Sequence, residues 1–148
     1  MRKLVFLLII LSITALCADE ETAVFRALDI TIDSGSEKLG AYQIEIKYSR
    51  DLVKITGIEG GENKAFNKAP YYDPRGLSAG RIILAAIADS KTRTPTGKTR
   101  VARLHLMVPS DKAPDLAITP VAAVNSNGKK IKITITAAQP ATQTEEKE

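Results

Sequence analysis

Alternation of apolar and polar positions is the strongest pattern in this chain. The clearest run lies at 41–48, where four apolar side chains take every second place and three polar side chains lie between them: Tyr42, Ile44, Ile46 and Tyr48 against Gln43, Glu45 and Lys47. A period of two is typical of a strand with one buried and one solvent-facing side. Turn-favouring polar residues at 49–51 precede a second apolar run at 52–58. The sequence therefore predicts two strands joined by a short corner.

Further strands are expected at 24–32, 81–88, 100–108, 116–124 and 130–136. The run 81–88 is apolar on both faces, which predicts a central strand. Asn127-Gly128 between the last two runs predicts a tight hairpin, because both residues tolerate positive φ. Residues 62–79 contain Pro70, Pro74 and Gly76 and show no period, so we expect a long ordered loop with at most one short edge strand.

No segment has a helical period, which excludes a parallel β-α-β fold. Seven or eight short strands with turn signals between them indicate an all-β fold, an antiparallel β-sandwich of about 8 strands. The 148 residues are enough for one domain of ordinary size.

The N-terminus resembles a secretory signal. Met1-Arg2-Lys3 is basic, and the apolar run from Leu4 to Leu16 is too short to span a membrane, which needs about 20 residues. We expect a signal peptide at 1–18, a β-sandwich domain at 19–138 and a disordered polar tail at 139–148. The protein is then secreted, periplasmic or held at the cell envelope, without a transmembrane segment after cleavage. Lipid anchoring through Cys17 is the less favoured alternative, because Leu16 is bulky where a small residue is needed.

The charge of the chain argues against one class of ligand, and its cysteine content excludes a disulfide. Removal of 1–18 leaves 19 basic and 17 acidic side chains, so net charge does not favour nucleic-acid binding and we expect none. Cys17 is the only cysteine, so an internal disulfide is excluded.

Several segments resemble the cohesin family. They are the runs at 39–49, 51–55, 58–60, 80–85, 96–97 and 101–108. The resemblance implies a jelly-roll sandwich in the same broad group as several bacterial carbohydrate-binding modules, with a protein-binding role. The sequence departs from the family at Ser49, where Asp is usual. It also has Ala41 and Gln43 where dockerin-binding cohesins often present Asn and Asp.

Residues that would support catalysis are few. His105 is the only histidine and has no second histidine or cysteine with which to share a metal. No serine lies in a nucleophile elbow, and Gly57, Gly60 and Gly61 open no helix that could bind phosphate. We therefore predict no enzyme activity, no catalytic residue, no metal site and no cofactor.

The favoured function is an interaction module that recognises a protein partner through one sheet face. That partner is a dockerin-like or other envelope or extracellular protein, with a link to polysaccharide binding or degradation. The candidate face consists of Gln43, Glu45 and Lys47, joined by Arg103 and His105 if their strand lies alongside.

Three alternatives remain open. Tyr71 and Tyr72 could form the stacking surface of a carbohydrate-binding module, although one of two adjacent tyrosines usually folds inward. A basic patch of Lys91, Arg93, Lys98 and Arg100 could attract an anionic polysaccharide, a lipid headgroup or an acidic protein, with Arg103, Lys129, Lys130 and Lys132 as further basic residues. An exposed edge strand could instead make the protein a subunit of an envelope assembly.

Overall fold

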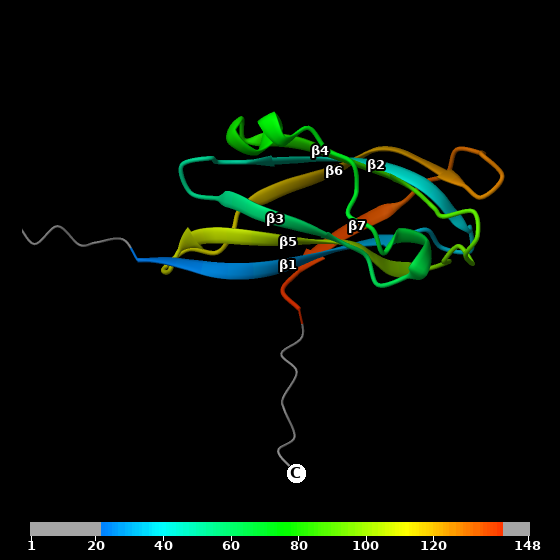
Figure 1. Ribbon diagram of the computed structural model, residues 1–148, viewed down its shortest axis with the longest axis horizontal. Coiled ribbons are helices and arrows are strands. Elements are labelled where there is room, and N and C mark those ends of the chain that lie inside the picture. Colours follow the sequence, from blue (N-terminus) through cyan, green and yellow to red (C-terminus); the bar gives the residue numbers. More distant parts are fainter. Residues whose placement is uncertain (1–21, 141–148) are drawn as a thin grey trace, which may run out of the picture.

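Two antiparallel sheets stack face to face in the computed structural model, which describes residues 22–140 (Figure 1). One sheet has the order β3-β5-β1-β7 and the other the order β4-β2-β6. The strands are β1 Ala23–Asp33, β2 Leu39–Tyr48, β3 Lys54–Gly60, β4 Arg81–Ile87, β5 Lys98–Pro109, β6 Leu116–Asn125 and β7 Thr134–Ala138. The predicted all-β antiparallel sandwich is confirmed, with seven strands rather than about eight.

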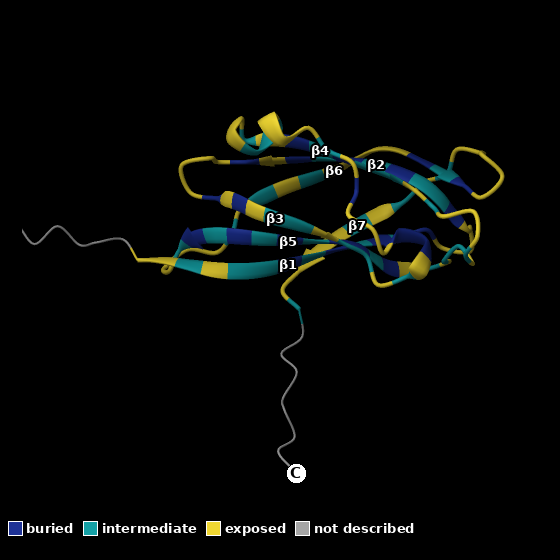
Figure 2. Cartoon of the chain, in the orientation of Figure 1, coloured by how far each residue is buried: buried dark blue, intermediate teal, exposed yellow. Residues whose placement is uncertain are grey.

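The core lies between the sheets and follows the alternation in the sequence (Figure 2). Its fully buried side chains include Ile30 and Ile32 of β1, Ile44 and Ile46 of β2, and Leu104 and Leu106 of β5. Branched aliphatic side chains on two pleated surfaces interdigitate closely, and each fully buried one stabilises the fold by about 1.5–3 kcal/mol. No disulfide is needed for this packing.

β2 is the central strand of its sheet, paired with β4 on one side and β6 on the other. At its end the backbone N–H groups of Leu52 and Val53 donate to the Ser49 carbonyl oxygen at 3.1 and 2.8 Å. The chain then enters β3 in the opposite sheet. The predicted short corner between two strands is therefore confirmed.

The long loop between β3 and β4 contains two 3₁₀ turns, η1 Lys64–Phe66 and η2 Pro74–Ser78. Two core tyrosines anchor it. The Tyr42 ring lies 5.6 Å from that of Phe66, and the Tyr48 hydroxyl donates to the Leu77 carbonyl oxygen at 2.8 Å. The Tyr42 hydroxyl also donates across the sandwich to the Val101 carbonyl oxygen at 3.2 Å, and burial raises the pKa of this tyrosine. In place of an edge strand, the loop makes one bridge, between Tyr71 and Ala85.

Two strand assignments from the sequence were wrong. The run 81–88 is not central, because β4 is the edge of its sheet and its outward apolar side chains face solvent. Asn127-Gly128 does not close a hairpin between sequential strands. Gly128 does take positive φ (77°), and the turn is followed by an isolated bridge between Val124 and Lys130. The chain then crosses to the other sheet, where β7 pairs with β1.

The ends of the chain lie largely outside the described residues. This applies to the predicted signal peptide at 1–18 and to residues 141–148 of the predicted tail. Within 22–140, no helix has both the length and the hydrophobicity needed to cross a membrane.

Candidate functional site

The outward side of the three-stranded sheet, here called the β4–β2–β6 face, is a set of four cross-strand rows. Directly opposed residues in antiparallel strands point to the same side of a sheet. From one end to the other, the rows are Ile87–Ala41–Val124, Ala85–Gln43–Ala122, Ile83–Glu45–Thr119 and Arg81–Lys47–Ala117. The face therefore changes from apolar at one end to charged at the other.

The apolar half surrounds a shallow hollow of about 260 Å³, half of whose lining residues are alanines, with Gln43 as its one amide side chain. Tyr71 lies beside it, because its backbone N–H donates to the Ala85 carbonyl oxygen at 2.8 Å and the Ala85 N–H donates back at 3.0 Å. Tyr71 is 79% exposed and Ile87 78% exposed. Exposed large apolar side chains beside a flat surface of small ones are typical of interaction sites.

An irregularity in β6 adds a third apolar side chain near this half of the face. Gln43 lies opposite Ala122, but the next residue, Ile44, lies opposite Pro120. Val121 is therefore left without an opposing residue, and it is 50% exposed. Bulges of this kind are common beside binding sites because they change the direction of a side chain.

Glu45 organises the charged half. Its Oε1 atom accepts from Arg81 Nε at 2.6 Å and its Oε2 atom lies 3.0 Å from Lys47 Nζ. The Glu45 side chain is 15% exposed, and the hydrogen bond from Lys47, followed by that from Arg81, lowers the pKa of its carboxyl group from the ordinary 4.5. The carboxylate thus remains ionised at mildly acidic pH and fixes both cations on the face.

We expect the Glu45 carboxyl group to titrate below pH 4.5 in a carbon-detected NMR titration. Because the folded pKa is lowered, the stabilisation it provides is complete above the unfolded pKa and is lost as pH falls through the folded pKa. Lys47→Met should raise the midpoint toward the ordinary value, since it removes the largest cause of the shift. Lys54→Met, on the other sheet, should leave the midpoint unchanged. A Glu45 midpoint that Lys47→Met does not move would contradict this account.

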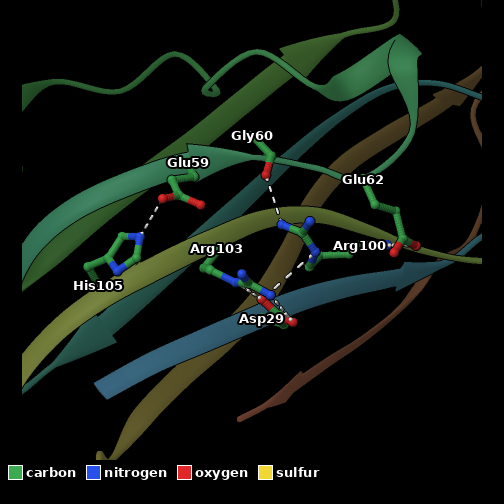
Figure 3. Close-up of polar contacts among 7 residues, drawn as sticks. All are labelled: Asp29, Glu59, Gly60, Glu62, Arg100, Arg103 and His105. Carbon is green, nitrogen blue, oxygen red and sulfur yellow. Dashed lines mark hydrogen bonds and ion pairs between the residues drawn. The ribbon is translucent and has the colours of Figure 1, made fainter. Parts of the chain in front are cut away.

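Arg103 and His105 do not join this face, because β5 belongs to the other sheet. The condition placed on them, that their strand lie alongside 41–47, is not met. Both point outward on the four-stranded sheet, and both are already paired (Figure 3). Arg103 Nε and Nη2 donate to the two Asp29 oxygens at 2.6 and 3.0 Å, and His105 Nε2 lies 2.8 Å from Glu59 Oε1.

Arg100 belongs to the same polar cluster and not to a basic patch. Its Nη1 atom donates to the Gly60 carbonyl oxygen at 3.0 Å and its backbone N–H donates to Glu62 Oε1 at 3.0 Å (Figure 3). Lys91, Arg93 and Lys98 are instead exposed at one end of the sandwich. The structure thus divides the four predicted basic residues between two places.

The two adjacent tyrosines separate as expected for neighbours of this kind. Tyr72 packs against the core and is partly buried, whereas Tyr71 is exposed. A single ring is therefore available for stacking, and it lies on the β4–β2–β6 face. Within the described part of the chain, no three His, Cys, Asp or Glu side chains are grouped so that they could hold a metal ion.

Ala85, Ile87, Ala122 and Arg81 are site residues that the sequence did not predict. A signal for Ala85 and Ile87 was present, because the run 81–88 has a second apolar side. That side was assigned to the protein interior, whereas in a sandwich of two layers the outer side of each sheet remains in solvent. The place of Tyr71 beside the sheet was not predicted, since the bridge that joins it to Ala85 is not encoded in any local pattern.

Comparison with known proteins is informative only at the level of structure. No family model matches the chain, and no curated protein matches it in sequence. Among solved structures, a chain of the complex between CaDoc0917 and CaCohA2 is similar, with a TM-score of 0.57 and 16% identity over 76% of this chain and 83% of that one. A type I cohesin–dockerin complex from Clostridium thermocellum gives a TM-score of 0.57 and 11% identity, over 76% and 82% of the two chains. A non-cellulosomal cohesin from the archaeon Archaeoglobus fulgidus gives 0.54 and 16%, with 75% of each chain covered.

The described part of the chain is therefore a cohesin-like jelly-roll sandwich. The predicted resemblance is confirmed for the fold, and the low identity limits the likeness to the fold.

Proposed function

We propose that this protein is an exported, non-catalytic interaction module that binds a protein partner through the β4–β2–β6 face. The partner is a dockerin-like or other extracellular protein, and the interaction is linked to polysaccharide binding or degradation. Support from outside the chain comes from the similar solved structures, one of which is a cohesin–dockerin complex.

One observation supports the proposal most strongly: the row of Tyr71, Ala85, Gln43 and Ala122 is apolar apart from one amide and one phenolic hydroxyl, yet it lies at the surface. Three of its residues belong to strands whose inward side chains form the core, and two backbone hydrogen bonds to Ala85 hold Tyr71 beside them. A partner can therefore dock without ordering a loop, which keeps the entropic cost of association low. Glu45, Lys47 and Arg81 form a charged border that can fix the partner's orientation.

Ala122→Arg tests this proposal by placing a long charged side chain in the middle of the face. We expect at least a tenfold weaker interaction with the protein that the unmodified domain captures from the secretome of its own organism, because burying an unpaired guanidinium costs more than about 1.4 kcal/mol. Ala138→Arg is the matched control, since Ala138 is also an exposed strand alanine but lies on the four-stranded sheet. Surface plasmon resonance measures both. Equal binding by both variants and the unmodified domain would exclude this face.

A carbohydrate-binding module is the second candidate, favoured by the high exposure of Tyr71. Sugar-binding surfaces use aromatic rings as platforms, and here one ring is presented. Affinity electrophoresis in neutral plant polysaccharides separates the two functions. Retardation that disappears in Tyr71→Ala would support sugar binding, whereas unhindered migration of the unmodified domain would support a protein partner.

A further inference from the structure

Three loops meet at one end of the sandwich and make it strongly basic. They are residues 34–38, 89–98 and 126–132, and Figure 1 shows them together at the end opposite the start of β1. Backbone hydrogen bonds join them: Leu39 N–H donates to the Pro95 carbonyl oxygen at 2.9 Å, and Ser126 N–H donates to the Lys38 carbonyl oxygen at 2.9 Å. These three loops are called the basic end below.

Charge is concentrated at the basic end. Its basic side chains are Lys38, Lys91, Arg93, Lys98, Lys129, Lys130 and Lys132, and its acidic ones are Glu37 and Asp89. Residues 22–140 contain 18 basic and 11 acidic side chains in all, so most of their positive surplus lies in these loops. A local concentration of one sign attracts an oppositely charged ligand far more strongly than the small net charge of the chain suggests.

The positive charges are not neutralised from within. Across residues 22–140, none of the seven basic side chains forms an ion pair. The two acids have other roles: Glu37 Oε2 accepts from Asn125 Nδ2 at 2.9 Å, and Asp89 Oδ1 accepts from the Lys91 backbone N–H at 2.9 Å. By contrast, Arg81, Arg100 and Arg103 on the sheet faces are all paired. The basic end thus brings seven cations without an ion pair close together.

The shape and lining of the basic end indicate what it binds. Lys38 and Arg93 border a hollow of about 690 Å³ that is also lined by the hydroxyl residues Ser90, Thr92, Thr94 and Ser126. One acid, Asp89, lines it as well, and its Oδ1 atom accepts from the Lys91 backbone N–H. Two cations among several hydroxyl groups suit a ligand that carries both negative charge and hydroxyl groups. The three loops contain no aromatic residue, which makes them unlike the stacking platforms that bind single-stranded nucleic acid.

We propose that the basic end is a second binding site, which adjoins the apolar end of the partner-binding face at Ala41, Ile87 and Val124, and that it takes an acidic polysaccharide. Lys38 and Arg93 contact a sugar carboxylate or other anionic substituent in the hollow. Lys129, Lys130 and Lys132 contact neighbouring units of the same polymer. Such a site would hold the module on a charged matrix while the rows of the β4–β2–β6 face beyond Ile87 remain free for the protein partner.

Binding of the full-length processed protein to polygalacturonate tests the proposal, with fully methyl-esterified polygalacturonate as the uncharged polymer. We expect binding to the acidic polymer that weakens as salt rises, and at least tenfold weaker binding to the ester. Lys38→Gln/Arg93→Gln should reduce the affinity at least tenfold. The matched control Arg50→Gln/Lys54→Gln removes two exposed positive charges from the opposite end and should change it less than twofold.

Three outcomes would overturn the proposal: no binding to polygalacturonate, equal losses in the two double variants, or tighter binding to duplex DNA or phosphatidylglycerol vesicles than to the polysaccharide.

A third variant, Lys129→Gln/Lys130→Gln/Lys132→Gln, should also weaken binding to polygalacturonate at least tenfold. Circular dichroism of each variant confirms that it is folded. Partner binding through the sheet face should be unchanged in all of them, so failure of this site and failure of the proposed function are distinguishable.

Discussion

Ile44→Ala is expected to lower the free energy of unfolding by about 2–5 kcal/mol. Ile44 lies in the middle of β2, the central strand of its sheet, and its side chain is completely buried. Removal of three carbon atoms there leaves a cavity between two sheets whose backbones are held by hydrogen bonds on both sides, so the site cannot collapse. Since a domain of this size is stable by about 5–15 kcal/mol, the loss is a large fraction of the total.

Urea denaturation measures this change, and Ile87→Ala is its matched control. Ile87 is the same residue type on the neighbouring strand of the same sheet, but it is 78% exposed. We expect Ile87→Ala to change the stability by no more than about 0.5 kcal/mol. The slope of the urea transition should be the same for both variants, because each exposes the same chain on unfolding. Similar losses of stability in the two would mean that the core does not lie where the structure places it.

The contrast between these isoleucines shows what the sequence can and cannot predict. Period-two alternation is a local property, and it identified the buried side of β2 and of β5 correctly. The position of a strand within its sheet depends on pairing between distant segments. Ile82-Ile83-Leu84 has the same composition whether or not another layer covers the outer side of the sheet, so the outward position of Ile83, Ala85 and Ile87 became visible only in the two-layer structure.

The candidate site was predictable to a similar degree. Gln43, Glu45 and Lys47 were correctly placed on one outward side, because alternation fixes which side chains point away from the core. Outward direction does not reveal whether a polar side chain is already paired. Arg103 and His105 were expected to be available, yet Asp29 and Glu59 from neighbouring strands engage them. These ion-pair partners come from strands far apart in the sequence, so a local pattern cannot predict them.

The Asn-Gly turn also shows that a local pattern does not predict which strands pair. Gly128 supplies one of the two positive φ angles that the pattern predicted, whereas Asn127 keeps a negative φ, so the local geometry is right only at the glycine. After the turn the chain first stays beside β6, where Ile131 N–H donates to the Ala123 carbonyl oxygen at 3.0 Å. It then crosses to the four-stranded sheet, where Ile135 of β7 lies opposite Ile32 of β1. Ile131, Ile133 and Ile135 are partly buried against the core along this path, which a hairpin along the free edge of β6 would not require.

The double substitution Tyr71→Ala/Ile87→Ala should weaken partner binding on the order of 100-fold. Both side chains project from the apolar half of the β4–β2–β6 face, and each exposes more than three quarters of its surface in the free protein. Interface energy is concentrated in a few large side chains, and the loss of two such anchors at about 1.4 kcal/mol each gives a change of this size. The bridge between Tyr71 and Ala85 uses backbone atoms only, so it survives the substitution.

Isothermal titration calorimetry with the captured partner measures this loss, and Phe25→Ala is the control. Phe25 is 76% exposed, but it lies on β1 in the four-stranded sheet. Its removal should leave the affinity within about twofold, because the partner contacts the other side of the sandwich. Should Phe25→Ala weaken binding as much as the double substitution, the partner would have to contact the four-stranded sheet. Arg103, His105 and their acidic neighbours would then be the residues to substitute next, since they dominate the polar surface beside Phe25.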